Sequence, residues 1–174
     1  MSTRTSVRTI SLAVIVLGAS AVAPPRLHAA TPSEVRSLRG LPGVEVVVEN
    51  LTEDLQALGL SGEQLRGEVE SRLRESGIRV LTSDDRAPGR PWLYFRVLAL
   101  KSSNVPLVSF FVTVQLRQDV TLDRNPDFHV GASTWDLRAG GLAGVSAIVS
   151  ALHTTTQDLV DRFSADFLTA NTRR

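Results

Sequence analysis

The chain contains no cysteine, a single lysine and few aromatic residues, which make up 5% of its 174 residues. Without cysteine, a disulfide-stapled fold, a thiolate-ligated metal site and a cysteine nucleophile are all excluded. The same absence excludes a bacterial lipoprotein, because that lipid anchor is attached to a cysteine. Since 43% of the residues are hydrophobic and only 21% are charged, intrinsic disorder is excluded as well. The fold must therefore be stabilised by an apolar core without covalent cross-links.

The N-terminal segment has the pattern of a secretory signal peptide. Arg4 and Arg8 precede an uncharged, mostly apolar run over residues 10–23, which a small-residue segment follows. The run is shorter than the roughly 20 apolar residues that a membrane-spanning helix needs. We therefore expect cleavage near Ala29 rather than a permanent anchor. This interpretation predicts a periplasmic or secreted protein with no transmembrane anchor in its mature form.

Charge changes sign when the predicted signal peptide is removed. The precursor has a net charge of +1, whereas residues 30–174 carry 16 basic and 18 acidic side chains and a net charge of −2. A slightly acidic chain is not typical of polyanion binding, so we expect no nucleic-acid partner. The excess of arginine over lysine indicates a GC-rich bacterial genome.

The remaining chain alternates between strand and helix patterns. Residues 30–41 show no periodicity and are expected to form a flexible leader, and residues 42–174 a single domain. Ser61 and Gly77 mark the start and end of a first helix, through an N-cap pattern and a left-handed C-cap. Strands are expected at 43–50, 78–81, 92–101, 107–122 and 128–138, and a long helix after residue 144. We predict an α+β two-layer sandwich in the order β-α-β-β-β-β-α, with a mostly antiparallel sheet and both helices on one face.

Apolar alternation in the strands predicts their register. Matching the two apolar rows of the central hairpin places Leu93 opposite Val114 and Arg96 opposite Phe111. The same rule places Trp135 beside Leu116. Residues 139–144, AGGLAG, are expected to break the sheet before the long helix.

The outer face of this sheet is the candidate binding surface, because it carries large apolar side chains where polar ones are usual. Two interpretations are open: the 30–41 leader or the 51–60 segment covers this face, or the face docks a partner. The predicted site residues are Trp92, Tyr94, Arg96, Leu98, Phe111, Gln115 and Arg138, with Leu100 on the same side.

Two further patterns point to other functions. His129, with Ser133 and Asp136, is the basis of an alternative hypothesis of a small secreted hydrolase, although Ser133 and Asp136 differ in strand parity. Asp123, Asn125 and Asp127 match the opening of a calcium loop, but the glycine and the glutamate that complete that pattern are missing; Phe128 and Thr134 occupy those places. We predict no metal site and no cofactor.

Several stretches carry a resemblance to known proteins. The segments GLSGEQLRGEVESRLRESGIRVL, VQLRQDVTL, ASTW and LVDRFSADFLTAN resemble a family of small uncharacterised secreted bacterial proteins. The order of elements is also loosely similar to α+β modules of cell-envelope assembly proteins, including the N-terminal domain of the Tol-system propeller protein. The resemblance implies an envelope location and this fold, and no catalytic residue.

The sequence thus favours a non-catalytic secreted or periplasmic module. Its expected partner is a protein or an envelope component, with self-association included, and its expected docking site is the outer sheet face.

Overall fold

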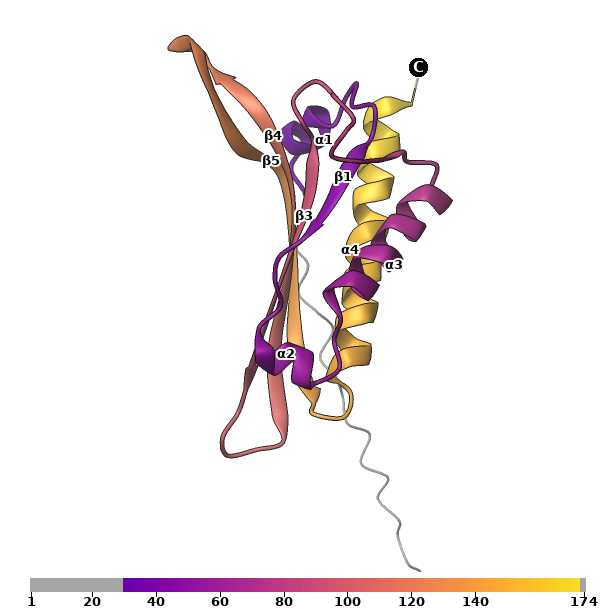
Figure 1. Cartoon of the computed structure of the whole chain (residues 1–174), viewed down its shortest axis with the longest axis vertical. Coiled ribbons are helices and arrows are strands. Elements are labelled where there is room, and N and C mark those ends of the chain that lie inside the picture. The colour runs from indigo at the N-terminus through magenta and orange to yellow at the C-terminus, as the bar shows by residue number, and fades with distance from the viewer. Residues whose placement is uncertain (1–29, 173–174) are drawn as a thin grey trace, which may run out of the picture.

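The computed structural model describes residues 30–172 and has the predicted α+β architecture. One mixed five-stranded sheet has the strand order β2-β1-β3-β4-β5. The two long helices, α3 and α4, lie side by side on one face of this sheet (Figure 1). The elements are α1 (Pro32–Ser37), β1 (Val44–Val48), α2 (Glu53–Ala57), α3 (Gly62–Glu75), β2 (Val80–Leu81), β3 (Trp92–Lys101), β4 (Leu107–Leu122), β5 (Asn125–Gly144) and α4 (Ile148–Asn171).

Helix α3 begins and ends where the sequence predicts. The Ser61 hydroxyl accepts a hydrogen bond from the backbone N–H of Gln64 at 3.4 Å. At the other end Gly77 has a φ of 79°, and the Ile78 N–H donates to the Leu73 carbonyl at 2.9 Å. This is the wrapped C-cap that a left-handed glycine permits. The chain then enters β2, which pairs in parallel with β1.

The core lies between the sheet and the helices. Its largest side chain, Trp135, is fully buried and meets the edge of the Phe163 ring at a centroid distance of 4.9 Å. The indole N–H donates to the Asp166 carboxylate at 3.0 Å, so its polar atom is satisfied. Trp135 is therefore the anchor that holds α4 onto β5.

The segment expected to be a flexible leader contains helix α1. Thr31 and Glu34 form a reciprocal capping box at its start. The side chain of Leu38, just after the helix, is fully buried. The Asn171 amide donates to the Leu38 carbonyl at 3.0 Å and accepts from the Gly40 N–H at 2.8 Å, which joins this segment to the end of α4. A helix of one to two turns is too short to produce a visible period, which is why the sequence pattern missed it.

The sheet register differs from the prediction by two residues in the β3–β4 hairpin. Leu93 pairs with Leu116 rather than Val114, and Phe111 pairs with Leu98 rather than Arg96. A shift of two leaves every side chain on its expected face, so alternation alone could not distinguish the two registers. Between β4 and β5 the expected pairing of Trp135 with Leu116 is confirmed.

Residues 139–144 do not break the sheet, which corrects the prediction. They continue β5 and pair with the first residues of β4. A Cβ on Gly140 would come within 2.5 Å of the Phe111 ring, and a Cβ on Gly141 within 3.3 Å of the Phe110 ring. These glycines make room for two phenylalanine rings on opposite faces, and neither has a positive φ.

Strands β4 and β5 also run beyond the rest of the sheet as a two-stranded arm. The last β4 residue that pairs with β3 is Arg117, and residues 118–122 pair only with β5. Figure 1 shows this arm projecting away from the helices. Its tip is a short turn at residues 123–124, and most of its side chains are exposed.

The predicted signal peptide, residues 1–29, lies outside the described residues. Within residues 30–172, no helix is long and apolar enough to cross a membrane.

Candidate binding surface

All seven predicted site residues lie on the face of the sheet that points away from α3 and α4. Their rows follow from the observed register, which places Tyr94, Gln115 and Asp136 in one row and Leu98, Phe111 and Gly140 in another. The seven share one surface but differ in what they contact. This outer face divides into two halves along the strands.

The first half, here called the apolar half, consists of Leu98, Leu100, Phe111 and Leu142. Their side chains are 50%, 71%, 56% and 59% exposed, respectively. Leu98 lies directly opposite Phe111 on the neighbouring strand, and Leu100 and Leu142 flank Ser109 in the next row. These four side chains therefore form one contiguous apolar patch on the open sheet.

The second half, here called the paired half, consists of Trp92, Tyr94, Arg96, Gln115 and Arg138 with their contacts. The guanidinium of Arg90 lies 5.0 Å from the centre of the Trp92 ring, and that of Arg117 lies 5.2 Å from the Tyr94 ring. Both rings are only partly exposed. Because arginines of the same chain already lie over them, these rings are less available to a partner than the sequence suggested.

The charges of the paired half also have partners within the chain. Arg96 binds the Glu49 carboxylate through two nitrogens, with its Nη2 at 3.2 Å from Oε1, and Arg138 Nε lies 2.9 Å from Asp136 Oδ2. Hydrogen bonding from Arg96 lowers the pKa of Glu49 and raises the pKa of the guanidinium. Both arginines are therefore already paired with carboxylates, and neither is an unpaired cation for an anionic ligand.

The two segments that one of the two open interpretations places over this face lie elsewhere. Leu38 after α1, and Leu51, Leu55 and Leu60 around α2, are buried in the core on the helical side of the sheet. Helix α1 packs against α4 and β5. Among residues 30–172, nothing covers the apolar half, as its exposed side chains show.

Leu142 is the site residue that sequence reasoning missed. The glycines beside it suggested a chain reversal, so the strand was expected to end at residue 138. A signal was present, because Trp135, Leu137, Ala139 and Ala143 continue the inward-facing row at a period of two. Extending that period places Leu142 on the outer face.

The structure does not assemble the hydrolase site that the sequence left as an alternative. His129 is exposed on the arm, and its Nδ1 lies 3.2 Å from the Thr121 hydroxyl. Ser133 donates to the Trp135 carbonyl at 3.3 Å, and Asp136 is bound to Arg138. Neither group approaches the imidazole, so the described residues contain no nucleophile and base pair at this place.

The acidic turn at Asp123, Asn125 and Asp127 occupies the tip of the arm. Asp123 belongs to the turn, whereas Asn125 and Asp127 are exposed residues of β5. Across residues 30–172, no group of three or more histidine, aspartate or glutamate side chains is placed to hold a metal ion.

Comparison with known proteins returned little. No protein-family model and no curated protein matches the sequence. Among solved structures, a PelC dodecamer from Paraburkholderia phytofirmans is similar at 17% identity and a TM-score of 0.43, over 82% of this chain and 95% of that chain. No residue role is carried over from that protein.

Proposed function

We propose that this chain is a non-catalytic binding module whose outer sheet face docks a protein or an envelope component. The observation that carries the proposal is the contiguous patch of Leu98, Leu100, Phe111 and Leu142, each at least half exposed. An apolar patch of this kind on an open sheet face commonly marks an interaction site.

The residues that border the patch also support the docking proposal. Arg96 and Arg138 lie in the neighbouring row, and both are paired with carboxylates of the chain. A patch without charge, bordered by satisfied polar groups, matches the usual arrangement of an apolar interface centre inside a polar rim. We expect the partner to present a complementary flat apolar surface, and a second copy of the chain is included among such partners.

The compartment is part of the proposal. From the predicted cleavage near Ala29 we infer that the module acts in the periplasm or outside the cell. With a net charge of −2 after that cleavage, nucleic acid is not among the expected partners.

The matched pair Phe111→Ser and Phe128→Ser tests the docking surface. Both phenylalanines are about equally exposed, at 56% and 50%, but Phe128 lies on the arm rather than on the outer face. Partners are captured by cross-linking the full chain in its source cells, and the self-association of the purified protein is measured by sedimentation. We expect Phe111→Ser to remove the cross-linked or self-associated species and Phe128→Ser to retain it.

Equal capture by both variants would contradict the proposal, provided that both melt at the wild-type temperature. Loss of the cross-linked species alone would identify a different molecule as the partner. Loss of the larger sedimenting species would identify a second copy.

A further inference from the structure

A second surface, at the opposite edge of the sheet from β5, has unused backbone hydrogen-bonding capacity. Strand β1 is flanked by β3 along its length, but β2 pairs only with Val44 and Glu45. From Val46 onward, no strand within residues 30–172 pairs with this side of β1. The free edge therefore begins in the middle of β1.

The direction of the backbone groups follows from the observed bonds. Glu45 and Glu49 donate their N–H groups to the Pro91 and Phe95 carbonyls on the β3 side, both at 2.9 Å. Because successive residues of a strand direct these groups to opposite sides, Val46 and Val48 direct theirs away from β3. Val48 thus presents a backbone N–H and a carbonyl at the free edge.

A turn after β2 keeps this edge open. The Thr82 N–H and hydroxyl both donate to Asp85 Oδ2, at 2.9 and 3.0 Å, and Arg79 pairs with the same carboxylate. The chain therefore leaves the sheet after Leu81 instead of continuing beside Val46 and Val48. This side of β1 is therefore left without a neighbouring strand beyond Leu81.

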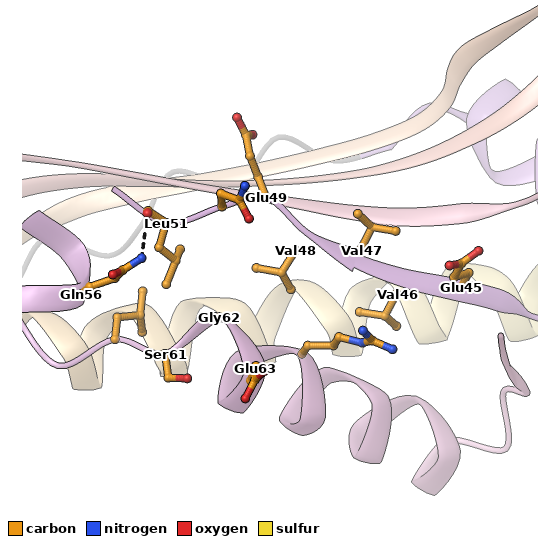
Figure 2. A pocket seen from close by; sticks show the side chains of 13 residues that line it. Glu45, Val46, Val47, Val48, Glu49, Leu51, Gln56, Ser61, Gly62 and Glu63 are labelled. Carbon is orange, nitrogen blue, oxygen red and sulfur yellow. Dashed lines mark hydrogen bonds between the residues drawn. The ribbon is translucent and has the colours of Figure 1, made fainter. Parts of the chain in front are cut away.

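A groove of about 590 Å³ lies along the free edge. Figure 2 shows it between β1 and the start of α3, with Val46 and Val48 directed toward the helix. Val48 is partly exposed here, although the other inward-facing valines of β1 are buried. Leu51, Leu60 and Gly62 complete the apolar wall.

The charges of the groove favour a basic occupant. Glu45, Glu49, Glu63 and Arg66 are its ionisable lining residues. Glu49 is paired with Arg96 and Arg66 with Glu70, whereas Glu45 and Glu63 take part in none of the salt bridges found within residues 30–172. Two unpaired carboxylates therefore remain to attract lysine or arginine.

The shape favours a single extended chain over a second folded copy. The free edge spans the few residues from Val46 to Asn50, roughly 15 Å at the rise of a strand. It lies beside α3 and is far shorter than the 20-residue strand β5 that forms the other edge of the sheet. A segment of about five residues matches this length, whereas β5 of a second copy would extend well beyond it.

We propose that this groove binds an extended basic peptide segment of a partner protein, which adds a strand to β1. Its backbone pairs with the Val46 carbonyl and with Val48, an apolar side chain packs on the partly exposed Val48, and a basic side chain meets Glu45 or Glu63. This site is separate from the apolar half and does not depend on it.

Selection from a phage-displayed library of random peptides of about ten residues tests the proposal on the full predicted mature chain. We expect enriched peptides with alternating β-branched residues and at least one lysine or arginine. Val48→Pro removes the edge N–H, whereas Val48→Thr has nearly the same shape and keeps it. An enriched peptide should bind Val48→Pro about tenfold or more weakly, and Val48→Thr as tightly as the wild type.

Two further measurements keep the test decisive if Val48→Pro does not fold. In the wild type, hydrogen exchange of the Val48 amide should slow when the enriched peptide is added. Glu45→Gln combined with Glu63→Gln should weaken binding severalfold, since it removes only the unpaired charge. Failure to enrich any peptide, unchanged Val48 exchange, or full binding by Val48→Pro would overturn the proposal. Phe111→Ser should leave peptide binding intact, so this proposal and the proposed function fail separately.

Discussion

The two halves of the outer sheet face lie on the same strands and both carry large side chains. They differ in how far those side chains are covered or paired by other residues of the chain. In the paired half, arginines lie over both aromatic rings and carboxylates bind Arg96 and Arg138. In the apolar half, four large side chains are at least half exposed and lie in adjacent rows of the outer face. Only the second half retains apolar surface for a partner to bury.

This difference shows that residue type does not identify a docking site by itself. Tryptophan and tyrosine are the side chains most expected at an interface. Here they are partly covered by Arg90 and Arg117, whereas leucines carry the exposed area. The comparison predicts that truncating side chains in the paired half alters stability, and that truncating side chains in the apolar half alters binding.

The largest expected effect comes from Gly140, which supports the apolar half. A Cβ there would lie 2.7 Å from the Phe110 carbonyl oxygen and 2.5 Å from the Phe111 ring. Gly140→Ala must therefore displace the ring and strain the β4–β5 pairing, with an expected loss of about 1–3 kcal/mol in the free energy of unfolding. Urea denaturation measures this loss.

Gly131 supplies the matched control on the same strand. A Cβ at Gly131 meets its nearest atoms at 4.0 Å, an ordinary contact. Gly131→Ala should leave the urea midpoint unchanged or raise it slightly, because alanine restricts the unfolded chain. Equal losses in the two variants would show that the Phe111 ring does not depend on Gly140.

The second effect separates the two halves through stability. Tyr94→Ala removes a partly buried ring that packs under Arg117, so we expect a loss of roughly 1–2 kcal/mol. Leu98→Ala, in the apolar half, removes a side chain that is 50% exposed and should cost less than half as much. Thermal melting of both variants checks the ratio, and a larger loss for Leu98→Ala would reverse the assignment of the halves.

The third effect concerns surface hydrophobicity rather than stability. Leu100 is 71% exposed, so Leu100→Ser should leave the melting temperature within about 1 °C of the wild type. It should nevertheless reduce the fluorescence of an apolar-surface dye, because it interrupts the patch. Leu168→Ser, on α4 at 45% exposure, is the matched control and should leave the dye signal unchanged. The reverse result would place the dye-binding surface on the helix.

Much of the fold was predictable because the sequence signals are local. Ser61 and Gly77 bound a helix through short-range caps, and alternation assigned faces in the hairpin correctly. Helix α1 was missed because a helix of one to two turns shows no visible period, and the bonds that join the residues after it to α4 come from far along the chain. The two-residue register shift preserves every face, so the pattern carried no information about it.

The sequence predicted which face of the sheet carries the candidate site. It did not predict that this face divides into an apolar half and a paired half. Which outer residues are exposed depends on side-chain pairs such as Arg117 with Tyr94, and the predicted register was two residues away from the observed register that brings these side chains together. Gly140 and Leu142 were missed because a glycine in a strand pattern can either end the strand or make room for a neighbouring ring. The sequence does not distinguish these two cases. Predicting the free edge of β1 would require knowing where β2 ends. A strand of two residues is too short for periodicity to show this.

The smallest expected effect concerns the ion pair of the paired half. Hydrogen bonding from Arg96 lowers the pKa of Glu49 in the folded chain below its unfolded value of about 4.3. The unfolded chain therefore binds a proton at a higher pH than the folded chain, and the pair adds stability above that value. This stability is lost as the pH falls through the lower, folded pKa. Glu49→Gln should have a slightly lower urea midpoint than the wild type at pH 6, and the gap should be smaller at pH 3.

Leu98→Ser is the control for this pH dependence, since it alters the neighbouring row without changing any charge. Its midpoint should follow the wild type in parallel at both pH values. A gap for Glu49→Gln that is no smaller at pH 3 than at pH 6 would mean that shape and packing, rather than charge, hold Glu49 against Arg96. The paired half would then be satisfied by packing alone, and the contrast with the apolar half would rest on its aromatic contacts rather than its ion pairs.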